Sequence, residues 1–217
     1  MKLKYAMFDL DGTVLDSLPI WDNLGVDMLR SQGYDPDPAL GKQLKIMTMK
    51  DGAQLCKDLF HMPQSIEEIA ALVEDQAKLA YNTVIGPKPG AENFLKRLKE
   101  AGIPMYIATN TRRDLVEDGL RRNGLLSYFE GIVTCPEVGQ GKKEGPAVYE
   151  EALRLLGGTK EDTVVFEDAI HPIRTAKKAG FRIAAIYDAS SEGEHEEIRA
   201  LSDYYFHSYD ELFPEKG

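Results

Sequence analysis

The sequence has little of what disulfide scaffolds, zinc sites and histidine catalysis require. It contains two cysteines, Cys56 and Cys135, which lie far apart and without CxxC spacing. A disulfide framework and a zinc site are therefore not expected, whereas a reducing compartment is. The four histidines are scattered and unpaired along the chain, which argues against a histidine-based active site or metal site.

Long apolar runs and an excess of positive charge are also missing. No segment approaches membrane-spanning length, and the first apolar run, in MKLKYAMFDLDG, is too short and too acidic for a signal peptide. The formal net charge is -10, which argues against nucleic acid or an anionic membrane as a partner, since both require a basic surface. We expect a cytoplasmic monomer, with a dimer as the alternative.

What the sequence does contain is a repeated change of hydrophobic period. Five short β-rich runs alternate with longer segments of helical spacing, and the runs are YAMFDL, PMYIATN, GIVTC, TVVFED and RIAAIYD. This alternation predicts an α/β fold with a Rossmann-like parallel sheet. A sixth run, DYYFHS, is a weaker candidate for an edge strand.

One region lacks strands and predicts a second domain. Between the first and second runs the pattern is helical throughout, including a segment that begins with Ser65 and Glu68 in capping-box register. We therefore expect an α/β catalytic core formed by residues 1–15 and 86–217, and an all-helical cap formed by residues 16–85. The Pro/Gly-rich segment from Gly86 to Gly90 is one expected hinge.

Acidic residues follow two of the predicted strands. Asp9 and Asp11 come at the end of the first run, and Glu167 and Asp168 at the end of the fourth, while Thr109 ends the second. Because the carboxyl ends of parallel strands meet at one edge of a sheet, these side chains should lie close together. Carboxylates packed in this way favour a hard cation, and the oxygen ligands suit Mg²⁺.

Four segments resemble the motifs of the haloacid dehalogenase superfamily. They are YAMFDLDGT, IATN, GKKEGPAVY and VVFEDA, in that order and with a helical insert after the first. The chain is most similar to the branch that contains sugar-phosphate phosphatases, phosphoglycolate phosphatases and beta-phosphoglucomutases. The second aspartate of the first motif is typical of members that transfer phosphate.

The resemblance implies a role for each residue of the first two motifs. Asp9 is the expected nucleophile and forms an aspartyl-phosphate, while Asp11 is the expected general acid and base. Asp9 and Asp11 would also bind the metal, Asp11 through its backbone carbonyl, and Thr13 would orient Asp11. The hydroxyl of Thr109, or alternatively that of Thr111, and the amide of Asn110 would bind phosphate.

The third and fourth motifs supply a lysine and two more acids. Counting back from Tyr149, and comparing GKKEGPAVY with the GKPAPDIY of the family, places the motif lysine at Lys143 rather than Lys142. Lys143 is thus expected to bind phosphate and to act in catalysis. Asp168 is expected to bind Mg²⁺ directly, and Glu167 directly or through water.

The helical insert is expected to select the substrate. The segment LKIMTMKD resembles the specificity loop of the family, and the candidate contacts are Trp21, Lys45, Thr48 and Lys50. Their structural alternatives are a place in the cap core for Trp21 and exposure to solvent for the lysines.

The resulting hypothesis is a Mg²⁺-dependent phosphatase that acts on small phosphorylated metabolites, sugar phosphates in particular. Mutases that resemble this chain carry a histidine where it has Trp21, which favours hydrolysis over the mutase alternative. The remaining alternative is a protein that binds phosphate or metal without catalysis.

Overall fold

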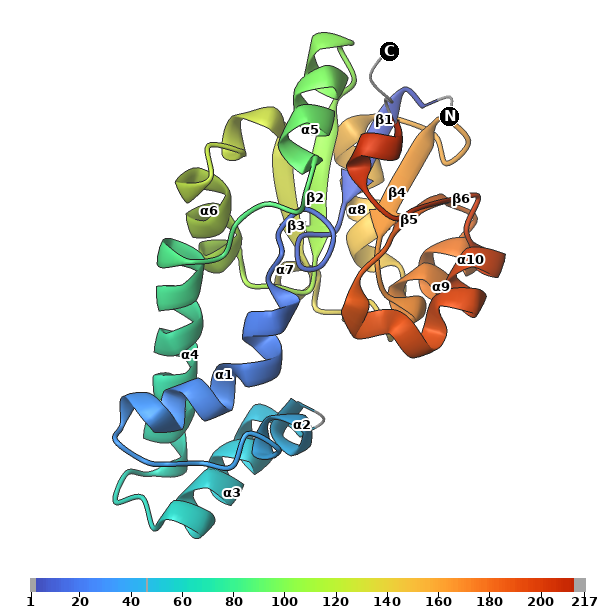
Figure 1. The fold of residues 1–217 in the computed structure, drawn as a ribbon. Coiled ribbons are helices and arrows are strands. Elements are labelled where there is room, and N and C mark those ends of the chain that lie inside the picture. The colour runs from blue at the N-terminus through green and yellow to red at the C-terminus, as the bar shows by residue number, and fades with distance from the viewer. Residues whose placement is uncertain (1–2, 46, 213–217) are drawn as a thin grey trace. The chain divides into compact units, whose positions relative to one another are not determined.

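The computed structural model describes residues 3–45 and 47–212, and it divides into two compact units. Met1–Asp16 and Gly86–Gly217 form one unit, and Ser17–Ile85 forms the other. In the first unit a six-stranded sheet is surrounded by helices, and in the second all the elements are helical (Figure 1).

The sheet is parallel throughout, and its strand order is β3-β2-β1-β4-β5-β6. Its strands are β1 (Tyr5–Phe8), β2 (Met105–Thr109), β3 (Gly131–Thr134), β4 (Thr163–Glu167), β5 (Arg182–Ile186) and β6 (Tyr204–Phe206). The predicted α/β fold with a parallel sheet is therefore confirmed, and DYYFHS contributes the edge strand β6.

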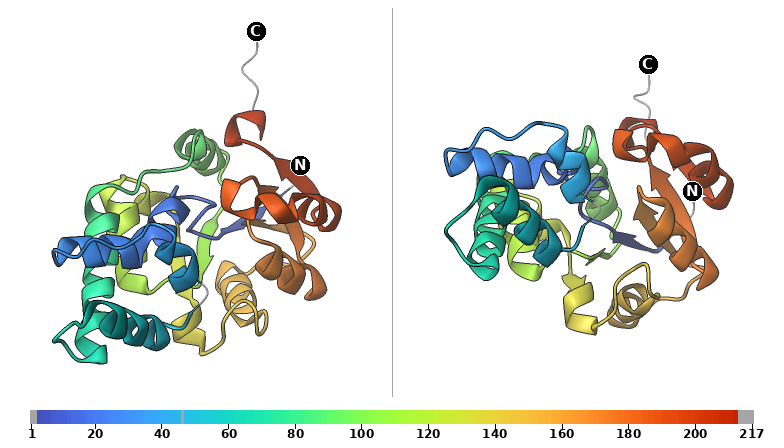
Figure 2. Two further views of the ribbon diagram at one scale, coloured as in Figure 1. Left: turned by 60° about the horizontal axis from the view of Figure 1, so that its bottom comes forward. Right: turned by 90° about the horizontal axis from the view of Figure 1, so that it is seen from below.

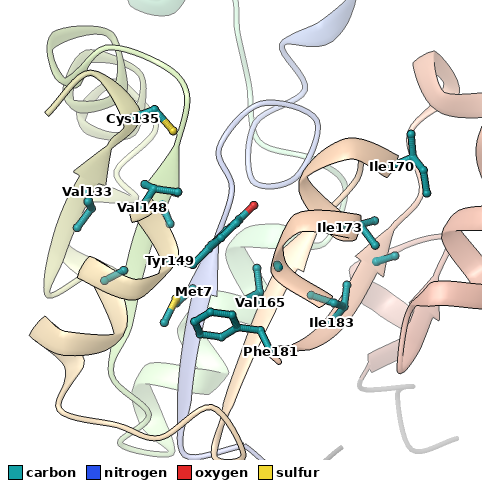
Figure 3. Close-up of a cluster of buried hydrophobic side chains, with 14 of the residues drawn as sticks. Met7, Val133, Cys135, Val148, Tyr149, Val165, Ile170, Ile173, Phe181 and Ile183 are labelled. Atoms are coloured by element: carbon teal, nitrogen blue, oxygen red, sulfur yellow. The ribbon is translucent and has the colours of Figure 1, made fainter. Parts of the chain in front are cut away.

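Helices cover both faces of this sheet (Figure 2). They are α5 (Ala91–Glu100), α6 (Arg113–Arg122), α7 (Cys135–Val138), α8 (Ala147–Leu156), α9 (Ile170–Lys178) and α10 (His195–Leu201), with 3-10 turns η1 (Leu126–Tyr128), η2 (Ala189–Glu194) and η3 (Tyr209–Leu212). On one face Met7, Val165 and Ile183 of the strands pack against Val148 of α8 and Ile173 of α9 (Figure 3). Burying these apolar side chains is the main stabilisation of this face.

Aromatic rings fill the other face. Phe8 of β1 stacks on Phe166 of β4 with ring centroids 4.4 Å apart, and Phe94 of α5 lies 5.3 Å from the Phe166 ring. Phe8 directly precedes Asp9, and Phe166 directly precedes Glu167. The rings therefore fix the ends of the two strands that carry the acidic residues.

The helical unit has a core of its own. It contains α1 (Leu18–Ser31), α2 (Leu40–Lys45), α3 (Met49–Phe60) and α4 (Ile66–Thr83). Apolar side chains from all four helices are buried together, among them Met28, Leu40, Cys56 and Ile69. The predicted capping box at the start of α4 is present, since Ser65 and Glu68 bond each other's backbone N–H groups. Among the described residues no helix is long and apolar enough to cross a membrane.

Two linker segments of the first unit run side by side. The N–H of Asp16 donates to the carbonyl of Gly86 at 2.9 Å, and the N–H of Lys88 donates to the carbonyl of Val14 at 2.9 Å. Hydrogen bonds therefore join the segment in which the chain leaves the α/β unit to the segment in which it returns.

A largely buried ion pair fastens the returning linker to the end of β5. The ammonium of Lys88 lies 2.7 Å from Asp188 Oδ2 and also donates to the carbonyl of Tyr187 at 3.1 Å. The side chains of Lys88 and Asp188 are 12% and 6% exposed. Burial alone would raise the pKa of Asp188, but hydrogen bonds from Lys88 and from the N–H of Ser190 lower it below its ordinary value.

We expect Lys88→Met to lower the free energy of unfolding by about 3 kcal/mol at pH 7, because it leaves a buried carboxylate without its cation. Since the folded pKa of Asp188 is lowered, the ion pair stabilises the protein above the unfolded aspartate pKa of about 4. That stabilisation is lost as the pH falls through the folded pKa, so the difference between the two proteins in urea unfolding should be smaller at pH 3 than at pH 7.

Lys4→Met is the matched control, because Lys4 also pairs with an aspartate, Asp162, but the Lys4 side chain is 71% exposed. Its unfolding curve should stay close to that of the wild type at both pH values. If Lys88→Met lowered the free energy of unfolding by the same amount at pH 3 and at pH 7, the role given to Asp188 would be contradicted.

Candidate active site

Three acidic side chains meet at the carboxyl edge of the sheet. Asp9 follows β1, Glu167 ends β4 and Asp168 follows it, and each offers a carboxylate oxygen within 4.8 Å of the others. The parallel register pairs Phe8 with Phe166, and the N–H of Asp9 donates to the carbonyl of Phe166 at 3.0 Å. Strand pairing thus brings together acids that lie far apart in the sequence.

A buried lysine joins two of these acids. The ammonium of Lys142, which is fully buried, lies 2.7 Å from Asp9 Oδ1 and 2.6 Å from Glu167 Oε1. Burial alone would lower the pKa of Lys142, but the two carboxylates raise it above its ordinary value. Lys142 is therefore a permanent cation at the centre of the site.

The position of Lys142 corrects the prediction that Lys143 is the lysine of the site, because Lys143 is exposed. Counting back from Tyr149 assumed a fixed spacing, whereas a tight turn lies between Gly141 and Gly145, whose N–H donates to the Gly141 carbonyl at 3.2 Å. The extra residue of this segment is accommodated in the turn, and the lysine that directly follows Gly141 enters the site.

Glu167 is fully buried, and its two oxygens differ. Oε1 accepts hydrogen bonds from Lys142 Nζ at 2.6 Å and from the hydroxyl of Tyr149 at 2.5 Å, whereas Oε2 has no hydrogen-bond partner among the described residues. Burial raises the pKa of Glu167 to about 7, although Lys142 acts to lower it. In Figure 3 the Tyr149 hydroxyl points away from the ring of Phe181.

Asp168 is held by the first motif. Thr13, which is completely buried, donates its hydroxyl to Asp168 Oδ1 at 3.0 Å. Burial, followed by the charges of Asp9 and Glu167, raises the pKa of Asp168 well above its usual range. The hydroxyl of Thr13, which was expected to orient Asp11, therefore contacts Asp168 instead.

Asp11 is positioned by the second motif. The hydroxyl of Thr111 donates to Asp11 Oδ2 at 2.5 Å, so this threonine contacts the predicted general acid. Thr109 is buried at the end of β2, and its hydroxyl oxygen accepts from the N–H of Thr111 at 3.2 Å. The side-chain oxygen of Asn110 accepts from the N–H of Lys142 at 3.2 Å. The second motif thus supports both Asp11 and the loop that carries Lys142.

The three clustered acids fit a divalent cation. Three carboxylates share one small region with the ammonium of Lys142, and the buried Glu167 Oε2 has no hydrogen-bond partner among the residues that the structure describes. Oxygen ligands of this kind suit Mg²⁺. Asp9, Glu167 and Asp168 are the side chains placed to bind it, while the carboxylate of Asp11 lies outside the cluster, and the predicted role of its backbone carbonyl stays a prediction.

Three of the four predicted specificity residues have partners within the helical unit. The indole N–H of Trp21 donates to the hydroxyl of Tyr81 at 3.1 Å, and Lys45 forms an ion pair with Asp22 at 2.5 Å. Thr48 caps α3 by accepting the N–H of Asp51 at 3.2 Å.

The fourth candidate, Lys50, is exposed, and no hydrogen bond or ion pair joins it to another described residue. Of the predicted specificity loop, Ile46 lies outside the described residues.

Sequence reasoning missed Tyr149 as a site residue, and it considered Thr111 only as an alternative phosphate ligand, not as a partner of Asp11. Tyr149 served only as the end of a motif, and its hydroxyl contacts Glu167 across 18 residues of sequence. Thr111 contacts Asp11 across 100 residues. The only available signal was that both residues lie in or next to the recognised motifs.

Comparisons with known proteins agree on the family and the fold. The family described as haloacid dehalogenase-like hydrolase matches residues 6–186. A phosphorylated carbohydrates phosphatase from Thermotoga maritima is 25% identical over 88% of this chain and 89% of its own. Hexitol phosphatase A from Escherichia coli is 29% identical over 86% of this chain and 84% of its own.

A solved structure shares the fold. It is that of a candidate beta-phosphoglucomutase from Thermotoga maritima, which superposes with a TM-score of 0.85 at 24% identity and covers 97% of this chain and 96% of its own. At this identity the likeness shows the fold alone.

We expect Lys142→Met to lower the free energy of unfolding by about 3 kcal/mol in the presence of a chelator, because it leaves Asp9 and the buried Glu167 without their cation. Denaturant titration measures the difference. Lys143→Met is the matched control, and its unfolding curve should not shift measurably, because Lys143 is exposed. A larger loss for Lys143→Met than for Lys142→Met would contradict the corrected assignment.

Proposed function

Because the chain belongs to the haloacid dehalogenase-like hydrolases, we propose that it is a phosphoric monoester hydrolase that releases phosphate from small phosphorylated metabolites, sugar phosphates in particular. The observation that carries the proposal is the placement of Lys142 Nζ, 2.7 Å from Asp9 Oδ1 at the carboxyl edge of the sheet. A permanent cation beside a partly exposed carboxylate is the arrangement that an attack on an anionic phosphoryl group requires.

In the first step a carboxylate oxygen of Asp9 attacks phosphorus. A bond forms between this oxygen and phosphorus while the bond from phosphorus to the leaving oxygen breaks, which gives an aspartyl-phosphate. Asp11 gives its proton to the leaving oxygen, so the product leaves as a neutral alcohol. Thr111, which donates to Asp11 Oδ2, holds the carboxyl group in place for this transfer.

In the second step water attacks the aspartyl-phosphate. Asp11, now ionised, takes a proton from the water, and the bond between phosphorus and the Asp9 oxygen breaks. Phosphate is released, and Asp9 and Asp11 return to their starting protonation states. Lys142 neutralises negative charge on the phosphoryl group in both steps, and Thr109 and Asn110 are the proposed donors to its oxygens.

Asp9, Glu167 and Asp168 are the proposed side-chain ligands of Mg²⁺, with the backbone carbonyl of Asp11 as a fourth oxygen. Bound Mg²⁺ would supply positive charge that draws the phosphoryl group toward Asp9 and withdraws electron density from it. The unpaired oxygen of Glu167 and the crowding of the three carboxylates support this assignment.

The helical unit, residues 17–85, is the proposed cap that selects the leaving group. Within this unit the indole N–H of Trp21, the ammonium of Lys45 and the hydroxyl of Thr48 already have partners. Lys50 is therefore the candidate best able to bind a second anionic group of the substrate. The names of the two phosphatases described above, which concern phosphorylated carbohydrates and hexitols, support a sugar phosphate as substrate.

We expect Mg²⁺-dependent release of inorganic phosphate from several sugar phosphates in a panel that also contains phosphoglycolate, nucleotides and an aryl phosphate. Excess chelator should abolish release. Asp9→Asn should lower kcat by at least about a thousandfold, because the amide is a far weaker nucleophile than the carboxylate. Circular dichroism should show an unchanged fold.

Asp162→Asn is the matched control, because Asp162 precedes β4 at the opposite edge of the sheet and its carboxylate pairs with exposed Lys4. It should keep wild-type kcat. Retained activity in Asp9→Asn would refute the nucleophile, whereas a wild type that interconverts sugar phosphates without net phosphate release would indicate a mutase.

We expect Lys50→Ala to raise KM about tenfold for substrates that carry a second anionic group and to leave KM unchanged for substrates with one phosphate, because only the former would pair with the ammonium. Steady-state kinetics on both kinds of substrate measure the split. Lys42→Ala, which removes another exposed lysine of the same unit, is the control. If Lys50→Ala and the wild type have the same KM for substrates with a second anionic group, Lys50 does not bind that group.

A further inference from the structure

A buried tyrosine near the end of the chain contacts the first motif. The hydroxyl of Tyr209, in η3, donates to the backbone carbonyl of Thr13 at 3.0 Å across 196 residues of sequence. Tyr209 is only 2% exposed. It also lies outside residues 6–186, which the family match covers, so none of the four motifs includes it.

Thr13 connects this hydroxyl to the acidic cluster. The Thr13 backbone carbonyl accepts from Tyr209, and the Thr13 side chain donates to Asp168 Oδ1 at 3.0 Å. Thr13 also lies two residues after Asp11, in a turn where Gly12 has a positive φ of 77° and its N–H donates to the Leu15 carbonyl at 2.8 Å. A shift of the Thr13 backbone would therefore move both Asp11 and the partner of Asp168.

The ring of Tyr209 is also packed against neighbouring residues. It lies 5.1 Å from the ring of Phe94, which packs against Phe166, the residue before Glu167. Asp210 approaches the backbone of Gly90 so closely that an added Cβ there would lie 2.6 Å from Asp210 Oδ1. The η3 segment thus lies against the start of α5, and its tyrosine ring packs on Phe94.

The hydroxyl is suited to act as a donor. Burial, followed by the negative charges of Asp168 and Asp9, raises the pKa of Tyr209 well above its usual range. The hydroxyl therefore keeps its proton beside the carboxylates and donates a hydrogen bond to the neutral carbonyl of Thr13. A fixed donor of this kind restrains a turn without adding charge to the site.

We propose that Tyr209 is a positioning residue, which holds the Asp11–Thr13 turn through the carbonyl of Thr13 so that Asp11 and Asp168 keep the geometry that catalysis and Mg²⁺ binding require. The proposal rests on the phosphatase function and Mg²⁺ site proposed above. The hydroxyl of Tyr209 contacts Thr13 rather than a reacting group or a proposed metal ligand, and it acts through Thr13.

The test removes the hydroxyl and keeps the ring. Tyr209→Phe should lower kcat about tenfold with KM changed by less than about twofold, because the turn loses its restraint while the phosphate donors stay in place. Calorimetric titration without substrate should show Mg²⁺ binding weakened about fivefold, since Asp168 is held by Thr13. A purely structural role would change the melting temperature but leave both of these readouts unchanged.

Tyr204→Phe is the matched control. Tyr204 lies five residues earlier, and its hydroxyl accepts from Arg182 Nη2 at 2.7 Å at the start of β5, the edge of the sheet opposite the acidic cluster. It should keep wild-type kcat and Mg²⁺ affinity. Tyr209→Leu, which removes the ring as well, should lose more activity than Tyr209→Phe.

Wild-type kcat and Mg²⁺ affinity in Tyr209→Phe would overturn the proposal, and they would do so even if Tyr209→Leu were inactive or unfolded, because the hydroxyl would then be dispensable. Failure of the phosphatase proposal looks different. The wild type itself would then release no phosphate from any substrate, and the calorimetric comparison of Tyr209→Phe with wild type would still measure whether the hydroxyl supports Mg²⁺ binding.

Discussion

The site depends on keeping three carboxylates together against their mutual repulsion. Asp9, Glu167 and Asp168 lie at the ends of adjacent strands, within reach of a single cation. One buried ammonium, that of Lys142, offsets part of this negative charge and is itself stabilised by it. Burying either the lysine or the acids without the other would leave unpaired charge away from water, which is unfavourable. The negative charge that Lys142 does not offset favours the binding of a divalent metal.

Much of the surrounding structure serves this arrangement. The stacked rings of Phe8 and Phe166 align the two strand ends, and hydroxyl groups from other elements bond the carboxylates. Tyr149 contacts Glu167, Thr13 contacts Asp168 and Thr111 contacts Asp11. Each acid therefore has a different hydrogen-bonding environment, which allows residues of the same chemical kind to take different roles.

The sequence was sufficient for the sheet and for the acids, because both follow from local patterns. Strand periodicity, and the rule that strand ends converge, placed Asp9 and Glu167 together without any knowledge of contacts. Lys143 was predicted in place of Lys142 because the turn contains one extra residue, which shifts the count from Tyr149 and leaves no sign in the composition. Tyr149 and Tyr209 went unrecognised, and Thr111 was considered only as a phosphate ligand, because a hydroxyl gains its role from a partner distant in sequence. Lys45 and Trp21 looked available for ligand for the same reason, since their partners Asp22 and Tyr81 were not apparent.

The hydrogen bond between Asp16 and Gly86 bears on how such a protein diversifies. Because the sheet unit holds both ends of the inserted segment next to each other, loop-closure entropy places little constraint on the length of what lies between them. The helical unit buries an apolar core of its own. An insert of a different length could therefore occupy these two positions without separating the strand ends that carry the acidic cluster.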